Sequence, residues 1–184
     1  MLDKMLIRHC APTLGALKTA SLFNYSFSCD KELDFAISSW NIQLNSKGIS
    51  LYILRKSQSR ALIYVCRASK LERDLNNRNV QCFLSKYGYS EFSTLYCIKK
   101  LKKRFQEVDE FPHEIGLFLG YPLEDVIGFV KNNGQNFKCT GCWKVYSNEC
   151  EATKLFMKYK HCKNIYAKLF DSQRKSVYQL TVAA

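Results

Sequence analysis

The sequence predicts an α+β (mixed α/β) fold in which a small mixed sheet with an antiparallel hairpin is covered by several helices. Residues 49–54 and 61–66 are rich in β-branched and aromatic side chains and flank a polar turn, as the strands of a hairpin do. Longer segments around them repeat apolar residues at three- and four-residue spacing, which is typical of amphipathic helices. Since no stretch has the composition of a linker, we expect one domain over residues 1–184.

Length and composition indicate a globular protein that does not enter a membrane. The chain has 184 residues, 47% of them hydrophobic and 14% aromatic, which suffices for an ordinary core. Its longest apolar run, 61–66, is far shorter than the roughly 20 residues of a membrane-spanning helix. Residues 1–23 lack the apolar segment of a secretory signal and are expected to belong to the fold. The nine cysteines are scattered among apolar residues, which favours reduced thiols in the cytoplasm.

Three elements are predicted before the hairpin. Pro12 is predicted to begin a short helix, because proline suits a first helical turn, and Cys10 then lies just ahead of that helix. Residues 21–27 form a predicted strand. A longer helix is predicted over 30–45, where apolar residues recur on one face. The apolar face of this helix consists of Leu33, Ala36, Ile37, Trp40 and Leu44.

Patterns of the same kind give the elements that follow the hairpin. They are helices over 69–78, 80–86 and 91–106, a short strand over 143–146, a helix over 148–170 and a final strand over 176–182. The helix 91–106 has a predicted core stripe of Leu95, Ile98, Leu101 and Phe105. We expect the helices 30–45, 91–106 and 148–170 to cover the sheet, with Trp40, Leu101 and Phe156 buried.

Residues 111–130 are predicted to form two short apolar helices that meet at a Gly-Tyr-Pro corner. Gly120 suits a helix C-terminus because it can take a positive φ, and Pro122 suits a first helical turn. Glu124 and Asp125 then lie in that turn, where the helix dipole favours negative charge. The corner resembles a helix-turn-helix, but these two acids would repel phosphates at the end that enters a DNA groove. We therefore expect no sequence-specific DNA binding.

The formal net charge of +12 predicts a salt-sensitive attraction to polyanions or acidic proteins. Two predicted helices carry basic clusters, which are Lys99, Lys100, Lys102, Lys103 and Arg104 on the first, and Lys154, Lys158, Lys160, Lys163 and Lys168 on the second. Each cluster can equally be the solvated outer face of an amphipathic helix. A basic module that binds nucleic acid or an acidic protein partner is therefore one functional hypothesis.

The spacing of Cys139 and Cys142 is that of thiol redox pairs and of half a zinc site. A structural zinc site needs two more ligands, and Cys150 with His161 or Cys162 are the nearest. Cys150 and Cys162, however, lie about 120° apart around a helix and cannot share one face. A redox pair, a zinc site and two ordinary turn cysteines all remain open.

Cys10 is the strongest single thiol, because backbone N–H groups at a helix start favour the thiolate, and His9 is adjacent. His113 and Glu114 precede a predicted helix, where they could bind a metal ion or transfer a proton as catalytic groups. The structural alternatives are a core cysteine and a histidine that forms a hydrogen bond across the corner. Since the sequence has no phosphate-binding loop and no Ser/His/Asp arrangement, it names no reaction.

Three blocks of the sequence are HCAPTL (9–14), FPHEIG with LGYP (111–122) and GCWKVY (141–146). Together they resemble a family of uncharacterised bacterial proteins, common in anaerobes and catalogued as a domain of unknown function. The resemblance covers nearly the whole chain and implies a role in redox or iron physiology. It also implies an acidic redox protein, such as a flavodoxin-like carrier, as partner. The motif positions found here are His9, Cys10, Pro12, His113, Glu114, Gly120, Pro122, Cys142, Trp143 and Tyr146, and Cys139 is outside the pattern.

The leading hypothesis is therefore a thiol-dependent redox or metal/iron-associated protein with Cys10 as its main thiol. A metal ion held by Cys10, His113 and Cys142 is the cofactor that this hypothesis allows. It requires these three residues, which are far apart in the sequence, to converge in the fold. The basic binding module is the alternative.

Overall fold

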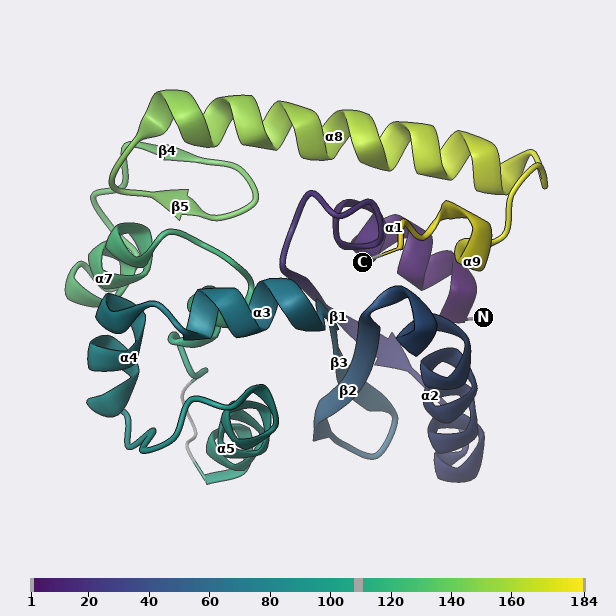
Figure 1. The fold of residues 1–184 in the computed structure, drawn as a ribbon, viewed down its shortest axis with the longest axis horizontal. Helices are drawn as coiled ribbons and strands as arrows, with labels where there is room; N and C mark the ends of the chain where they lie inside the picture. Colours follow the sequence, from purple (N-terminus) through teal and green to yellow (C-terminus); the bar gives the residue numbers. More distant parts are fainter. Residues whose placement is uncertain (1, 108–110, 184) are drawn as a thin grey trace.

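The computed structural model describes residues 2–107 and 111–183, and its centre is a sheet of three antiparallel strands (Figure 1). The strands are β1 (Ala20–Ser26), β2 (Ile49–Lys56) and β3 (Arg60–Arg67), in the order β1-β3-β2. β2 and β3 form the predicted hairpin, and β1 pairs with the other edge of β3. The α+β class is thus confirmed. Because β1 and β2 both pair antiparallel with β3, this sheet is antiparallel rather than mixed.

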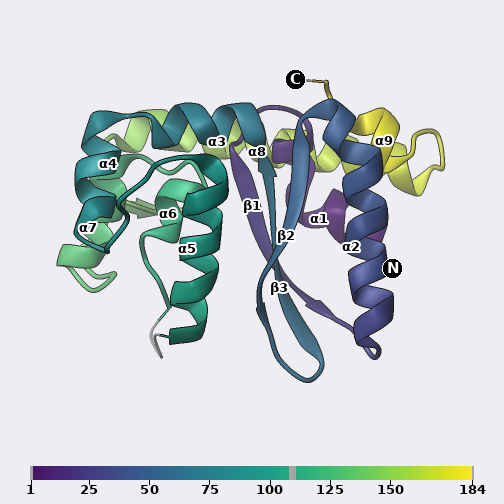
Figure 2. The ribbon, with the colours of Figure 1, turned by 60° about the horizontal axis from the view of Figure 1, so that its bottom comes forward.

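One face of the sheet is covered by α1 (Leu2–Leu14), α2 (Asp30–Leu44) and the short α9 (Val177–Leu180). Figure 2 shows α1 and α2 on the opposite side of the strands from α5 and α6. The apolar residues of this face form one cluster, which includes Leu6, Leu14, Leu44, Ile63, Val65 and Val177. The helix predicted over 30–45 is therefore confirmed, although its Trp40 is only partly buried.

Two predictions for this face are wrong. The first helix begins at Leu2 rather than at Pro12, because buried residues continue at helical spacing through its whole length. Pro12 is tolerated in its last turn, where it removes one helical hydrogen bond. The predicted final strand 176–182 contains α9 instead, and Ser176 and Gln179 form a capping box at its start.

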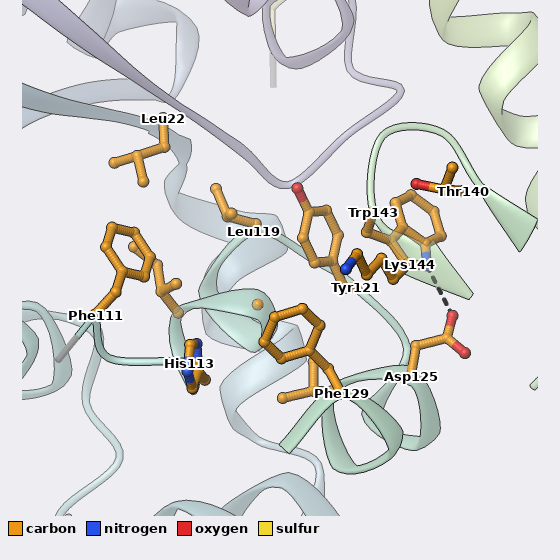
Figure 3. A pocket seen from close by; sticks show the side chains of 13 residues that line it. Leu22, Phe111, His113, Leu119, Tyr121, Asp125, Phe129, Thr140, Trp143 and Lys144 are labelled. Carbon is orange, nitrogen blue, oxygen red and sulfur yellow. Dashed lines mark hydrogen bonds between the residues drawn. The ribbon is translucent and has the colours of Figure 1, made fainter. Parts of the chain in front are cut away.

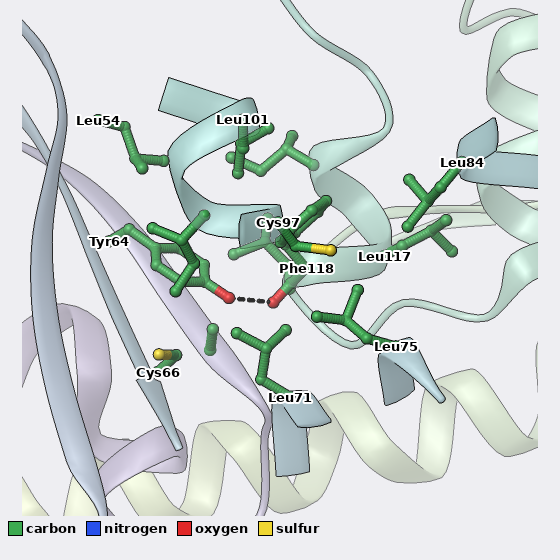
Figure 4. Packing of buried hydrophobic residues seen from close by; sticks show 14 of the residues in the cluster. Leu54, Tyr64, Cys66, Leu71, Leu75, Leu84, Cys97, Leu101, Leu117 and Phe118 are labelled. Atoms are coloured by element: carbon green, nitrogen blue, oxygen red, sulfur yellow. Dashed lines mark hydrogen bonds between the residues drawn. The ribbon is translucent and has the colours of Figure 1, made fainter. Parts of the chain in front are cut away.

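The other face of the sheet is covered by α3 (Ala68–Leu75), α4 (Arg78–Ser85), α5 (Thr94–Glu107) and α6 (Ile115–Phe118). Tyr64 of β3 donates its hydroxyl hydrogen to the carbonyl oxygen of Phe118 at 2.7 Å, which joins α6 to the sheet (Figure 4). Leu101 is fully buried, as predicted. Leu95 is 57% exposed, because it lies in the first turn of α5 and points away from this core.

The long helix α8 (Glu149–Asp171) runs from the hairpin of β4 (Cys139–Thr140) and β5 (Lys144–Val145) to α9 (Figure 1). The helix predicted over 148–170 is present, but it packs on α1 and on this hairpin rather than covering the sheet. Phe156 is consequently only partly buried. None of the helices in the described part of the chain is both long and apolar enough to span a membrane.

The predicted corner between α6 and α7 (Leu123–Lys131) is present. Gly120 has a φ of 75°, and a Cβ at this position would lie 2.6 Å from Thr19 Oγ1, so only glycine fits. Pro122 occupies the N-cap position of α7, one residue before its first helical turn. The corner turns α7 back toward the β4–β5 hairpin, and this brings the second and third sequence blocks together.

The buried side chain of Arg67 joins β3 to the end of α1 and to the segment that follows α9. Arg67 is only 2% exposed and donates hydrogen bonds to the carbonyl oxygens of Thr13 at 3.0 Å, Leu14 at 2.8 Å and Val182 at 2.7 Å. Thr13 and Leu14 end α1, where carbonyl groups lack helical partners. The guanidinium therefore caps α1 and holds the end of the chain against β3.

Candidate functional site

A cavity of about 560 Å³ lies between β1, α6, α7 and the β4–β5 hairpin (Figure 3). Its wall is mainly apolar and aromatic, with Phe111, Leu119, Tyr121, Val126, Phe129 and Trp143. Its polar side chains are His113, Asp125, Thr140 and Lys144. Cavities of roughly 300–1,000 Å³ with an apolar lining and a few polar groups are characteristic of small-molecule sites. We call this cavity the aromatic pocket.

Close packing holds the wall of the aromatic pocket in place. The rings of Tyr121 and Trp143 stack with centroids 4.8 Å apart, and Phe156 of α8 contacts Trp143 edge-on at 4.6 Å. Gly116 lets α6 approach α7, because a Cβ at this position would lie 2.7 Å from Cγ2 of Val126. Both contacts fix side chains that face the cavity, so the pocket is largely formed in the absence of a ligand.

Asp125 is the most highly connected polar side chain of the pocket and is 2% exposed. It accepts hydrogen bonds from Trp143 Nε1 at 2.7 Å and from Tyr146 N, Ser147 N and Ser147 Oγ, each at 2.8 Å. Burial alone would raise the pKa of this carboxyl, but the donors of Tyr146, Trp143 and Ser147 outweigh it and lower the pKa. Asp125 is thus an ionised structural anchor, and each of its two oxygens accepts at least one hydrogen bond.

His113 and Lys144 supply the donor groups of the pocket. His113 is exposed, its ring lies 5.0 Å from that of Phe129, and its nitrogens have no hydrogen-bond partner within the described ranges. The ammonium group of Lys144 donates to the carbonyl oxygen of Gly134 at 2.7 Å and lies 4.9 Å from the Phe137 ring centroid. In the view of Figure 3, the Lys144 side chain extends between the Tyr121 and Phe129 rings.

Glu114, in contrast, faces the core rather than the pocket. It is fully buried and forms an ion pair with Arg104 of α5. Burial and the neighbouring Glu114 carboxylate raise the pKa of the Tyr89 hydroxyl. Although His113 and Glu114 are adjacent in the sequence, their side chains lie in different environments. The structure therefore does not bring them together as a catalytic pair.

The placement predicted for Cys10 is wrong. It lies inside α1, is fully buried, and burial raises the pKa of its thiol to about 12, although Lys18 and Ser21 act in the opposite direction. The helix start that would favour a thiolate is eight residues earlier, at Leu2. His9 stacks on Phe23 with ring centroids 5.3 Å apart. Within the described residues, His9 forms no hydrogen bond with the Cys10 thiol and so does not act as its base. Cys10 behaves as a core residue.

The cysteines near the hairpin do not form a metal site. Cys139 is half-buried in β4 and Cys142 is exposed in the turn that follows, while Cys150 is exposed and Cys162 is buried in α8. In residues 2–107 and 111–183, no group of three or more His, Cys, Asp or Glu side chains lies close enough to hold a metal ion. The proposed ligands Cys10, His113 and Cys142 therefore do not meet.

Lys18 is an unexpected neighbour of two of these thiols. Its ammonium group lies 5.0 Å from the ring centroid of Tyr121, and burial lowers its pKa to about 8, with Cys142 and Cys10 acting in the opposite direction. Tyr121 in turn donates its hydroxyl hydrogen to the carbonyl oxygen of Cys142 at 3.2 Å. Tyr121 thus contacts Lys18 and the backbone of Cys142 and also lines the aromatic pocket.

The basic cluster on α5 is partly occupied by internal contacts. Arg104 pairs with Glu114, and Lys103 lies 3.3 Å from Glu107. Lys99 and Lys102 are exposed. Only part of the predicted phosphate-binding stripe is therefore available to a partner.

Sequence patterns did not reveal the pocket, although two of the three sequence blocks supply part of its lining. His113 and Tyr121 come from the second block, and Trp143 and Lys144 from the third. The first block packs in the α1 core and contributes no lining residue. Tyr121, Asp125 and Phe129 lie in a stretch that predicts only a helical corner, so no local signal marks them as a site.

Comparison with known proteins identifies a family for this chain. No curated protein and no solved structure matches the chain. A family model described as protein of unknown function DUF3793 matches residues 6–181. Since this range includes almost the entire chain, the protein belongs to that family of unknown function, DUF3793.

Proposed function

We propose that this protein binds a small molecule with a flat, largely apolar body in the aromatic pocket. The observation that carries the proposal is the convergence of Tyr121, Phe129 and Trp143 on one cavity of about 560 Å³. Aromatic faces of this kind stack on planar ligands, and such contacts add about 0.5–1.5 kcal/mol beyond the burial of area. The pocket takes its residues from β1, α6, α7 and the hairpin, so it depends on contacts between β1 and the second half of the chain.

The polar groups indicate that the ligand carries an anionic or carbonyl oxygen. Lys144 and His113 offer hydrogen-bond donors, and Lys144 adds a positive charge. Asp125 is a poor partner for a ligand donor, because it is buried and both of its oxygens already accept hydrogen bonds, from Trp143 and Ser147. A cationic ligand, which aromatic rings alone would attract, is disfavoured by the Lys144 charge.

Tryptophan fluorescence tests this proposal. The chain has two tryptophans, so Trp40→Phe leaves Trp143 as the single reporter inside the pocket. We expect anilinonaphthalene sulfonate, a flat apolar anion, to quench it in a saturable manner. Phe129→Ala should then weaken binding about fivefold or more, because it removes one aromatic wall.

Phe137→Ala is the matched control, since Phe137 lies beside Lys144 but outside the pocket wall. Lys144→Gln should weaken the sulfonate and leave a neutral anilinonaphthalene unaffected. Absence of saturable quenching in the folded protein, or equal losses in the Phe129 and Phe137 variants, contradicts the proposal.

We also propose a thiol-dependent redox role in which Cys142, rather than Cys10, is the reactive thiol. The supporting observation is that exposed Cys142 lies on the hairpin that supplies Trp143 and Lys144 to the pocket, with the Lys18 ammonium nearby. A net charge of +12 also suits an acidic electron carrier as partner. Anaerobic purification with metal analysis, an absorption spectrum and a redox titration of Cys142 tests this role. An unreactive Cys142 without any chromophore removes it.

A further inference from the structure

A second concave site lies on the other side of the molecule, between α1, β1 and the C-terminal half of α8. It has a volume of about 730 Å³. Lys4 and Arg8 of α1 and Lys163 of α8 line it, and Asp171 is the acidic side chain in the lining. The apolar part of its surface comes from Met5, Tyr25 and Phe170. We call it the basic groove.

The three cations of the basic groove form no ion pair with an acidic side chain in the described part of the chain. Lys4, Arg8 and Lys163 are exposed, and none of them forms an ion pair within residues 2–107 and 111–183. Arg8 and Lys163 come from different helices yet both act on His9, whose pKa is lowered first by burial and then by these two charges. Positive charges that line one concavity repel each other, and an anion bound there relieves that repulsion.

We infer that the basic groove binds a phosphate ester, with the phosphate between Arg8 and Lys163. Arginine offers paired N–H donors that match phosphate oxygens, and lysine adds a point charge. The Asp171 carboxylate, also in the lining, repels an anion, so the phosphate is expected at Arg8 and Lys163 rather than beside Asp171. The flat organic part of the ester then lies against Tyr25 and Phe170.

The groove suits a phosphate better than the basic cluster of α5 does. On α5, Arg104 and Lys103 already have acidic partners in Glu114 and Glu107. In the groove, the cations face one concavity from two helices and remain unpaired in the described structure. The phosphate can belong to a free nucleotide or to the end of a nucleic-acid strand, and the two sources are separated by experiment.

Isothermal titration of the full chain tests the inference with three probes: inorganic diphosphate, a nucleoside diphosphate and a short single-stranded oligonucleotide. Arg8→Gln and Lys163→Gln should each weaken the binding of the nucleoside diphosphate about tenfold or more, because each removes a charge-assisted contact. The control is Lys99→Gln/Lys102→Gln, which removes exposed charge from α5. This control should bind as the unmodified protein does.

The outcomes separate the possible ligands. If the nucleoside diphosphate binds more tightly than inorganic diphosphate, a free nucleotide is the ligand, whereas selective oligonucleotide binding identifies a nucleic-acid end. Binding of none of the probes at low salt overturns the inference. An equal loss in the Lys99/Lys102 control overturns it as well, because the attraction then comes from net charge alone.

Nuclear magnetic resonance of His9 gives an independent readout. Arg8 and Lys163 contribute to its lowered pKa, after burial. A phosphate between them offsets their charge, so the pKa of His9 should rise when the ligand binds. Ligand binding without any change in the His9 titration would place the phosphate elsewhere and refute the inference.

Discussion

Trp143 donates its indole N–H to the Asp125 carboxylate at 2.7 Å, and this bond joins the β4–β5 hairpin to α7. The same carboxylate also accepts hydrogen bonds from the backbone N–H groups of Tyr146 and Ser147. Since Asp125 and Trp143 both line the aromatic pocket, the bond sets the position of one wall. The architecture of the pocket therefore depends on one buried charge.

Asp125→Asn should destabilise the protein by about 1–3 kcal/mol at neutral pH, because an amide cannot accept all the bonds of the carboxylate. The lowered pKa of Asp125 contributes stability that is present above the unfolded-state pKa and is lost as pH falls through the folded-state pKa. Urea denaturation at neutral and acidic pH measures this effect. The variant should lose stability less steeply on acidification. Glu124→Gln, at an exposed neighbouring position, is the control and should behave as the unmodified protein.

Gly116→Ala should destabilise the protein by about 1–3 kcal/mol, since its Cβ would lie 2.7 Å from Val126 Cγ2. Val126→Ala alone creates a small cavity and is also destabilising. In the double variant the two effects should partly cancel, which a double-mutant cycle based on chemical denaturation measures. Strict additivity of the two substitutions would show that α6 and α7 do not approach in this way.

Thiol alkylation of the native protein should modify Cys82, Cys142 and Cys150, which are exposed, well before Cys10. Cys10 is fully buried and the pKa of its thiol is raised to about 12, so it is neither accessible nor ionised at neutral pH. Peptide mapping by mass spectrometry after timed exposure to iodoacetamide gives the order. Equal rates for Cys10 and Cys142 in the folded protein would contradict the core placement of Cys10.

Arg67→Met should destabilise the protein by about 3–5 kcal/mol. The substitution removes the N–H groups that donate hydrogen bonds to the carbonyl oxygens of Thr13, Leu14 and Val182. Arg67→Lys should recover little of this, since one ammonium group cannot span the three oxygens. Thermal and urea denaturation measure both variants. Arg60→Gln removes an exposed arginine from the same strand and should have almost no effect.

Local patterns were sufficient for the elements that bury one continuous face. The β2–β3 hairpin, α2 and α8 each repeat apolar residues over a long enough segment to be predicted within a few residues of their observed ends. The four-residue helix α9 differs from the predicted strand, because its alternating residues also fit a strand and its capping box decides for a helix. Pro12 led to a helix start that was predicted too late, because proline is more common in the first turn of a helix than in the last, where it lies in α1.

The sequence by itself determined the α+β class, the hairpin and the identity of the long helices, because their periodicity reflects which side of each element is buried. Only the tertiary structure decided which side chains meet. Glu124 and Asp125 are equivalent acids in one helical turn, yet Asp125 alone is buried and anchors the hairpin. Cys10 is likewise a core residue, because α1 begins at Leu2 and Cys10 lies on its buried face. The physical reason is that the environment of a side chain, and hence its charge and reactivity, is set by contacts between segments distant in the sequence.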